Sequence, residues 1–418
     1  MPPNFCGRAL LSGVLLAFFC PASVAQTTSP DFVSARNSVL RTVLDNNPDL
    51  QEAHHQTVAA ETRRDQVAIP DPRLTWSTAP LSYFDSDVPI GQRIELAQPF
   101  PFPGSLAPTR DRMDALTEAA DADTDSLALH HAARAARQVD RIARVDTTRR
   151  LLEEHRGLLE ELLQSSLARY EAGTAAAQDP LQVEIELAHV AHELVVLDAE
   201  KRVAMAELQG LAGGTLPNEL PTFSAVPSPS LVGESEAPHP DILSADARMR
   251  ASEAAVQSAR RSALPDLAVM TSYASMWRNP AHRWMAGVSV ELPLHWRARR
   301  AEVEEARAES AAAVSALTAS ETWLTANEAV AKARFDEAMH VVALYGDTVV
   351  PTARKRVEVV RSTFESTSGS FELLVRTERA LRDAEIQSIA ARTEAWSRLA
   401  ELQVARGQMP GFELEGTP

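Results

Sequence analysis

An internal duplication constrains the fold of this chain more than any other feature of its sequence. Short motifs occur in the first half and recur, in the same order, in the second half. The pairs are Asn47-Pro48-Asp49-Leu50 with His239-Pro240-Asp241-Ile242, Pro72-Arg73-Leu74 with Pro265-Asp266-Leu267, Arg169-Tyr170-Glu171 with Thr363-Phe364-Glu365, and Gly213 with Gly407. Matches that keep their order over most of a chain indicate repeated structural units. We therefore expect equivalent repeats at residues 26–213 and 239–407.

Each repeat has the same predicted order of elements: a helix, a proline-bearing break, two short strands, a very long helix, a turn and a returning helix. The predicted helices span 31–68, 106–171 and 181–211 in the first repeat, and 240–263, 298–365 and 373–405 in the second. Residues 214–238 contain five prolines and predict an irregular connector, and residues 408–418 are expected to form a C-terminal tail. The composition, with 16 glycines and 5% aromatic residues in 418, also favours a mainly α-helical fold.

The strand prediction depends on a period of two. Trp284, Val288 and Val290 alternate with Met285 and Ser289, and the segments at 74–78, 94–96 and 267–273 follow the same pattern. Aromatic residues lie near the strand ends and in the loops between them, as expected at membrane interfaces. These are Trp76, Tyr83, Phe84, Tyr273, Trp277 and Trp284. Spacing alone leaves two alternatives, barrel strands or hairpins on a soluble helical body.

Four strands cannot close a membrane barrel, because the smallest such barrels have about eight. An open sheet in a bilayer would leave unpaired amides in hydrocarbon. If the chain enters a membrane it must therefore oligomerise, and three copies would supply twelve strands. The predicted long helices carry apolar residues seven apart, such as Leu152 and Leu159, which is typical of coiled-coil packing.

The N-terminus predicts an export signal at residues 1–25. Arg8 precedes an apolar run from Ala9 to Phe19 that is too short to span a bilayer, and small residues near Ala25 allow cleavage. Cys6 and Cys20, the two cysteines of the chain, lie inside this segment. The mature protein would have no thiol or disulfide.

Composition and motifs exclude several classes of function. A net charge of −16 disfavours nucleic acid as a partner. The sequence has neither a dinucleotide nor a P-loop glycine pattern, and it has no motif of a metalloprotease or serine hydrolase. His189 and His192 are three residues apart, but the pattern offers no third metal ligand, so we predict no metal site. Together with the missing motifs, this leads us to predict no cofactor and no enzymatic activity.

The sequence resembles the TolC-type outer-membrane efflux factor family, especially its heavy-metal and cation efflux members. The residues that carry the resemblance are Asn47-Pro48-Asp49-Leu50, Pro72-Arg73-Leu74, the run from Gln98 to Gly104, and Arg169 to Thr174 with Asp179 and Leu181. The resemblance implies a homotrimer with a twelve-stranded barrel in the outer-membrane lipid and an α-helical barrel in the periplasm. It also implies a periplasmic adaptor and an inner-membrane pump, expected to be of the RND type, as partners.

In that family the helix-turn-helix tips meet the adaptor, so the resemblance implies adaptor contact at the first hairpin tip and leaves contact by the second tip open. The candidate residues are Tyr170, Gly173, Thr174, Asp179 and Leu181 in the first tip, and Phe364 and Gly369 in the second. The second tip departs from the pattern, because Thr367 replaces the usual glycine and Leu373 replaces the aspartate. We therefore expect the tips to differ.

The main functional prediction is a passive exit duct driven by a separate pump, since the sequence shows no energy-coupling motif. The alternative is a soluble periplasmic coiled-coil adaptor or scaffold, and a secreted hydrolase is a weaker third reading. The cargo stays open among metal cations, drugs, solvents and polypeptides, with cations favoured by the resemblance. Clustered glutamates such as Glu184 and Glu186 would favour cations if they line the tunnel, although such clusters usually face solvent.

Overall fold

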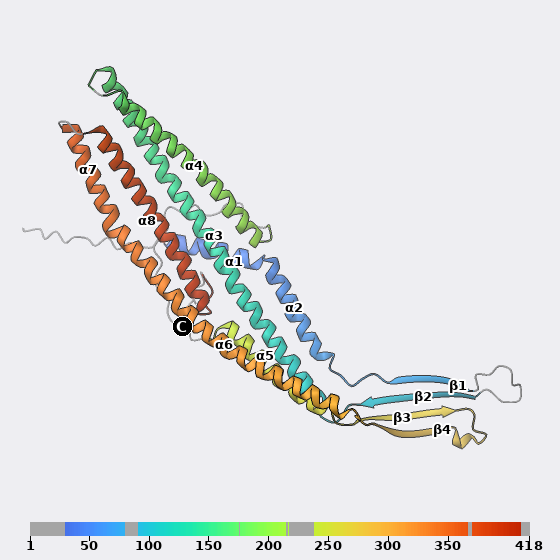
Figure 1. Cartoon of the computed structure of the whole chain (residues 1–418). Coiled ribbons are helices and arrows are strands. Elements are labelled where there is room, and N and C mark those ends of the chain that lie inside the picture. Colours follow the sequence, from blue (N-terminus) through green and yellow to red (C-terminus); the bar gives the residue numbers. More distant parts are fainter. Residues whose placement is uncertain are drawn as a thin grey trace, which may run out of the picture.

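The computed structural model describes residues 30–79, 91–174, 176–214, 216, 238–366 and 370–410. The molecule is elongated, with a β-sheet at one end and the tips of two helical hairpins at the other (Figure 1). The signal peptide predicted at 1–25, most of the connector and residues 411–418 lie outside the described residues.

The two halves contain corresponding elements. The first half consists of α1 (Pro30–Asp45), α2 (Pro48–Asp65), β1 (Arg73–Ala79), β2 (Gly91–Phe100), α3 (Leu106–Glu171) and α4 (Gln178–Leu211). The second half consists of α5 (Pro240–Arg261), β3 (Asp266–Ala274), η1 (Pro280–His282), β4 (Trp284–Glu291), α6 (Trp296–Ala343), η2 (Leu344–Val349), α7 (Val350–Ser366) and α8 (Phe371–Ala405). The predicted long and returning helices are confirmed, with α3 matching its predicted bounds.

The first predicted helix is wrong in one respect, because residues 31–68 form two helices instead of one. Proline has no backbone N–H, so Pro48 cannot continue a helix but suits the first position of a new one. Asn47 caps that new helix, since the Leu50 N–H donates to its Oδ1 at 3.0 Å. The chain therefore ends α1 at Asp45 and starts α2 at Pro48.

The segment predicted as one helix at 298–365 also has an internal feature. It runs without interruption from α6 into α7, but residues Leu344–Val349 form a π-helical turn, η2. Such turns add a residue to the helical repeat and widen it locally. The side chains before and after η2 are therefore rotated relative to an uninterrupted α-helix.

The same type of contact is made once in each half, at Asn47 and at His239. Asn47, which caps α2, donates from Nδ2 to the Leu211 carbonyl at the end of α4 (2.8 Å). His239, which caps α5, hydrogen-bonds through Nε2 to the Val404 carbonyl near the end of α8 (2.9 Å). Each returning helix then ends at a glycine with positive φ, Gly213 or Gly407.

These two glycines are required by close packing as well as by their backbone conformation. A Cβ at Gly213 would lie 2.7 Å from the Asn46 carbonyl oxygen, and one at Gly407 would lie 3.2 Å from the His239 Cα. The end of each returning helix thus packs directly on the start of α2 or α5, the helix that leads into the strands of its own half.

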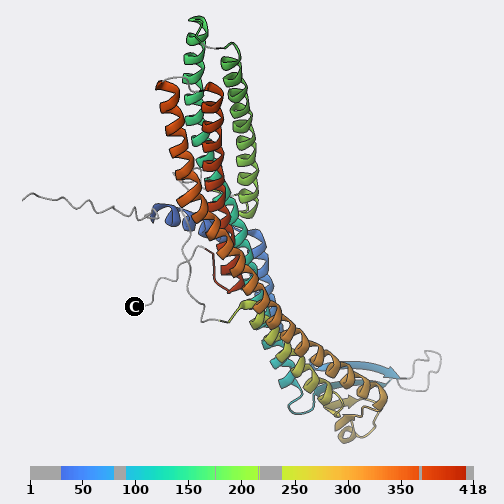
Figure 2. The ribbon, with the colours of Figure 1, turned by 60° about the vertical axis from the view of Figure 1, so that its left-hand side comes forward.

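The hydrophobic core follows the middle of the helical body and extends into the hairpins. Val39, Ile142, Leu208, Phe335 and Leu399 belong to a central cluster that joins α1, α3, α4, α6 and α8. The hairpins continue side by side from this centre toward their tips (Figure 2). Among the described residues, no helix has both the length and the apolar character needed to cross a membrane.

A second cluster joins the two hairpins. Leu152 and Leu159 of α3 and Val183 and Val190 of α4 are buried in it, and α8 contributes Val375. Both pairs are seven residues apart, so the predicted coiled-coil spacing is confirmed for α3 and holds for α4 as well.

Candidate functional site: the sheet and the helical tips

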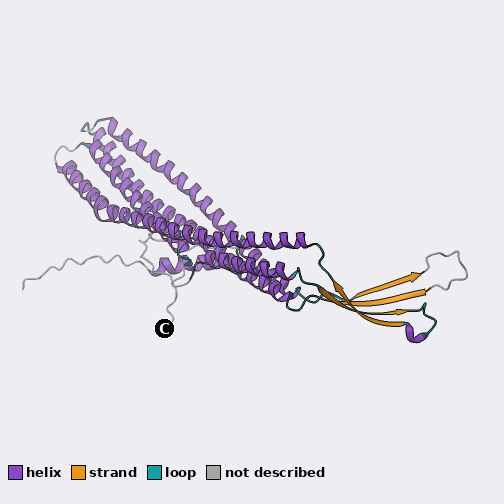
Figure 3. Ribbon diagram, turned by 60° about the horizontal axis from the view of Figure 1, so that its bottom comes forward, coloured by secondary structure: helices purple, strands orange, loops and turns teal. Residues whose placement is uncertain are grey.

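The four strands form one antiparallel sheet in the order β1-β2-β3-β4 (Figure 3). β2 and β3, which come from different repeats, pair at its centre with Ile94 opposite Tyr273 and Phe100 opposite Leu267. The outer strands are β1 and β4, and each has one side without a partner strand among the described residues. The sheet is therefore open at both edges.

One face of the sheet is predominantly apolar, with Gln98 and Thr271 among its few polar residues. The register aligns Trp76 with Ile94 in β1 and β2, and Val269 with Val288 in β3 and β4. Side chains that stand directly opposite one another in a sheet point to the same face. The apolar residues on this face are Leu74, Trp76, Ile94, Leu96, Phe100, Leu267, Val269, Tyr273, Trp284, Val288 and Val290.

This apolar face is exposed in the single chain, with Val288 at 68% and Trp284 at 67% of full exposure. The opposite face carries polar and small residues, including the Arg93–Glu95 ion pair at 2.6 Å and Ser289. The predicted alternation is thus confirmed. An exposed apolar surface of this extent needs a lipid or protein partner.

Aromatic side chains gather at the ends of β3 and β4 that face the connecting turn. Tyr273 and Trp284 are cross-strand neighbours with ring centroids 5.3 Å apart, and Trp277 packs on His282 in the adjoining turn. Trp76 is exposed on the same face, within β1. Tyr83 and Phe84 lie outside the described residues. Trp296, which sequence analysis missed, is exposed at the start of α6, just beyond β4.

The first helical tip is built by a glycine cap. Gly173 has φ +71°, its N–H donates to the Tyr170 carbonyl, and the Thr174 N–H donates to the Arg169 carbonyl. This pair of bonds is a Schellman motif, which closes a helix C-terminus with a left-handed residue. Gly173 and Thr174 therefore have a structural role in ending α3 and starting the turn to α4.

The first tip also presents apolar side chains to solvent. Tyr170 is 49% exposed, and Leu181 and Ile185 in the first turns of α4 are each 57% exposed. Asp179 lies in the first turn of the same helix, where a carboxylate favours the helix N-terminus. The structure thus brings Tyr170, Gly173, Thr174, Asp179 and Leu181 to one end of the molecule.

The second tip is arranged differently. Phe364 is half-buried, packs against Phe371 at 5.8 Å between ring centroids, and receives the Arg169 guanidinium over its ring at 4.3 Å. Phe364 therefore joins the two tips to each other. Gly369 lies outside the described residues. Ser370 caps α8 by accepting from the Leu373 N–H.

Behind the tips, a buried polar cluster joins α4 to α8. Glu186 accepts from Arg379 at 3.0 Å and lies 4.0 Å from the buried Arg382, which also contacts Glu193 and Asp383. Glu186 was among the residues that would favour cations if they line the tunnel. Its burial between the hairpins assigns it to their packing instead.

His189 and His192 are both exposed on α4, and no group of three potential ligands occurs within the part of the chain that the structure describes. His131 is buried and contacts Asp49 at 3.3 Å.

The chain combines a sheet that has two open edges and one apolar face with two long helical hairpins. This combination is the TolC type of outer-membrane fold. The comparisons with known proteins agree. Residues 231–408 match the model of the outer membrane efflux protein family. No curated protein sequence matches the chain.

Several solved structures share the fold. The outer-membrane channel OprN is 20% identical with a TM-score of 0.74, covering 90% of each chain. CusC is 15% identical with a TM-score of 0.78 and covers 97% of this chain and 99% of its own. VceC from Vibrio cholerae is 15% identical with a TM-score of 0.74 and covers 90% and 96%. The resemblance to the TolC-type outer-membrane efflux factor family is therefore confirmed.

Proposed function

We propose that three copies of this chain form an outer-membrane exit duct. The sheet carries the proposal, because it combines an apolar face, a polar face and two open edges. Closing three sheets edge to edge gives twelve strands, which turns the apolar faces toward lipid and the polar faces toward a lumen. The family match and the shared fold support an efflux channel role and an outer-membrane location with a periplasmic helical part.

The duct is passive in this proposal. The family model that the chain matches describes an efflux protein rather than an enzyme, and the sequence lacks an energy-coupling motif. A partner must therefore drive transport. We infer that a periplasmic adaptor binds the helical tips, where Tyr170 and Leu181 are exposed, and connects the duct to an inner-membrane pump. A pump of the RND type is our expectation for that partner.

Cysteine cross-linking between β1 and β4 tests the trimer. Thr75→Cys in β1 is combined in turn with Met285→Cys, Gly287→Cys or Ser289→Cys in β4, all on the polar face. At least one pair should form disulfides between subunits, because neighbouring strands bring facing Cβ atoms to about 4 to 5 Å. Gel electrophoresis without reductant should then show dimers and trimers but nothing larger, since a ring of three is closed.

The matched control pairs Thr75→Cys with Val288→Cys, whose side chains point to opposite faces. It should remain monomeric on the gel. Monomers alone for all three test pairs, or an open ladder beyond trimers, would contradict a closed three-subunit wall.

The cargo requires a separate test. We predict that the cargo is a metal cation. If so, a strain that lacks this protein should become more sensitive to copper, zinc or cobalt than to dyes. Greater sensitivity to dyes alone would favour drugs or solvents as the cargo instead.

A further inference from the structure

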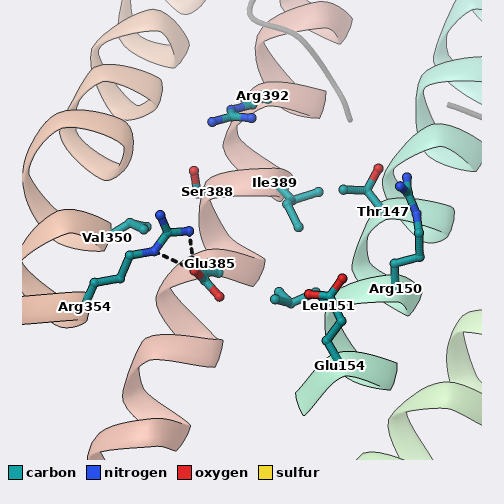
Figure 4. A pocket seen from close by; sticks show the side chains of 10 residues that line it. All are labelled: Thr147, Arg150, Leu151, Glu154, Val350, Arg354, Glu385, Ser388, Ile389 and Arg392. Atoms are coloured by element: carbon teal, nitrogen blue, oxygen red, sulfur yellow. Dashed lines mark hydrogen bonds and ion pairs between the residues drawn. The ribbon is translucent and has the colours of Figure 1, made fainter. Parts of the chain in front are cut away.

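A cavity of about 320 Å³ lies between the two hairpins, with α8 between α3 and α7 (Figure 4). Each helix contributes one face to it, because the lining residues recur at helical spacing. They are Thr147, Arg150, Leu151 and Glu154 of α3, Val350 and Arg354 of α7, and Glu385, Ser388, Ile389 and Arg392 of α8. A volume of this size accommodates a small organic or inorganic ligand.

The charges of the cavity are unusual for this chain. Three arginines line it against two glutamates, although the whole protein has a net charge of −16. Arg354 is matched by Glu385, to which it donates at 2.6 and 3.0 Å. After this pairing, the cavity still has more arginines than glutamates. Its positive potential is therefore local, because the rest of the molecule is acidic and repels anions.

Arg392 is the residue that this arrangement leaves without a counter-ion. It is half-buried, and it makes no hydrogen bond or ion pair within the ranges that the structure describes. Burial lowers the pKa of its guanidinium. A desolvated arginine that lacks an acceptor is costly, and an anionic ligand would remove that cost.

Ser388 offers a second donor next to Arg392. The two residues are four apart on α8, so their side chains lie on the same face, one turn from each other. Ser388 is buried, and its hydroxyl likewise has no hydrogen-bond partner in the described parts of the chain. A hydroxyl and a guanidinium at this spacing provide several N–H and O–H donors for one oxyanion.

The third wall of the cavity begins at the π-helical turn. η2 ends at Val349, and Val350 and Arg354 line the cavity directly after it. π-Turns are rare, cost helical hydrogen bonds and occur frequently at functional sites. Here the turn sets the rotation of α7 and thereby aims Arg354 at α8 and Glu385 (Figure 4).

We propose that this cavity binds a small oxyanion, carrying a phosphate or a carboxylate, through Arg392 and Ser388 of α8. Arg354, which is paired with Glu385, and Arg150 line the two flanking walls. The bound anion would bridge α3, α7 and α8 and hold the hairpins together. This proposal does not depend on transport, because it concerns only the helical body.

Calorimetric titration of the full chain, extracted in detergent, tests the site with inorganic phosphate and with citrate as separate probes at constant ionic strength. At least one probe should bind with saturation and raise the melting temperature, since a ligand that binds only the folded state stabilises it. Phosphate binding would identify a phosphate-type ligand, and binding of citrate alone a carboxylate-type ligand.

Three variants of the cavity and one control variant assign the binding to the cavity. Arg392→Gln should weaken it by at least about tenfold and Ser388→Ala by a smaller factor, as expected for charged and neutral hydrogen bonds. Arg392→Lys keeps the charge but loses the planar guanidinium, so it should bind with intermediate affinity. It also serves as a control in case the glutamine variant fails to bind because it is misfolded. Arg356→Gln, an exposed arginine of α7 outside the cavity, should bind like the unaltered protein. Failure of both probes to bind, or equal binding by Arg392→Gln, would overturn the proposal.

Discussion

Arg36 of α1 and Asp140 of α3 form a buried ion pair across the middle of the helical body. The guanidinium Nε and Nη2 reach the two carboxylate oxygens at 2.7 and 3.0 Å, and the side chains are only 2% and 1% exposed. The Arg36 guanidinium also lies 4.9 Å from the centre of the Trp396 ring. One contact thus ties α1 to α3 and α8 inside the central core.

Removing one partner of this pair should be strongly destabilising. Asp140→Ala leaves the Arg36 charge buried without a counter-ion, so we expect a loss of about 3 to 5 kcal/mol in unfolding free energy. Guanidinium unfolding of the solubilised protein measures it. The double variant Arg36→Met with Asp140→Leu should recover most of the loss, because it removes both charges. Equal stability of the single variant and the unaltered protein would disprove the role of this pair.

Stability should fall in mild acid because of His155. Burial, reinforced by the Arg382 charge, lowers the pKa of His155 from 6.5 to about 4. The unfolded chain therefore binds a proton at this residue between those values while the folded protein does not, so stability is full above pH 6.5 and is lost as the pH falls toward 4.

The lowered pKa of His155 contributes about 3 kcal/mol to the free energy of unfolding at neutral pH. About 2 kcal/mol of this contribution should be lost at pH 5 relative to pH 7.5. Denaturant unfolding at the two pH values, compared between the unaltered protein and His155→Gln, isolates this contribution. The glutamine variant should lose that much less on acidification, whereas His189→Gln, at an exposed position on α4, should behave like the unaltered protein. Identical pH profiles for all three proteins would exclude His155 as the cause.

Gly157 within α3 and Gly173 just beyond its end should respond oppositely to alanine. Neither meets another atom within 4 Å of an added Cβ, so packing does not distinguish them. Gly173 has φ +71°, and Gly173→Ala should cost about 1 to 2 kcal/mol in strain. Gly157 lies within the helix, and Gly157→Ala should gain about 0.5 to 1 kcal/mol. Thermal unfolding compares the pair, and a change of the same sign in both would refute this account of the tip.

Neighbouring positions of β4 should differ in their tolerance of charge. Val288 belongs to the apolar face and Ser289 to the opposite one. If the apolar face contacts lipid, Val288→Arg should cost about 2 to 4 kcal/mol, while Ser289→Arg should be tolerated in the lumen. The fraction of trimer recovered from outer membranes measures the effect. Equal recovery of the two variants would count against a lipid-facing sheet.

The exposed apolar residues of the first tip should matter for transport and not for assembly. Leu181→Glu should reduce efflux while the yield of trimer is unchanged, because a charge disrupts an apolar contact surface. Ala188→Glu is the matched control, as it lies on the same helix face about 10 Å farther from the tip. Normal efflux by Leu181→Glu would place the adaptor contact elsewhere.

Local chemistry made the elements of this fold predictable from sequence. The alternation of Trp284, Val288 and Val290 assigns a strand and its apolar face together, because side chains of a strand have only two directions. The end of α3 also followed from sequence, since Gly173 suits the left-handed cap. The break at Pro48 was the error, although Asn47 and Pro48 together are a helix start signal.

Only the tertiary structure decided which polar side chains of the long helices are buried and which partners they contact. A helix in a bundle has neighbours on several sides, so its sequence does not fix which face meets which neighbour. Glu186 therefore looked like a solvated or lumenal acid but is buried against Arg379 and Arg382. Arg36 and Asp140 meet only because α1 folds back across α3. The sequence by itself determined the elements, the duplication and the polarity of the sheet, whereas the packing of helices distant in the chain determined the ion pairs and the arginine-lined cavity.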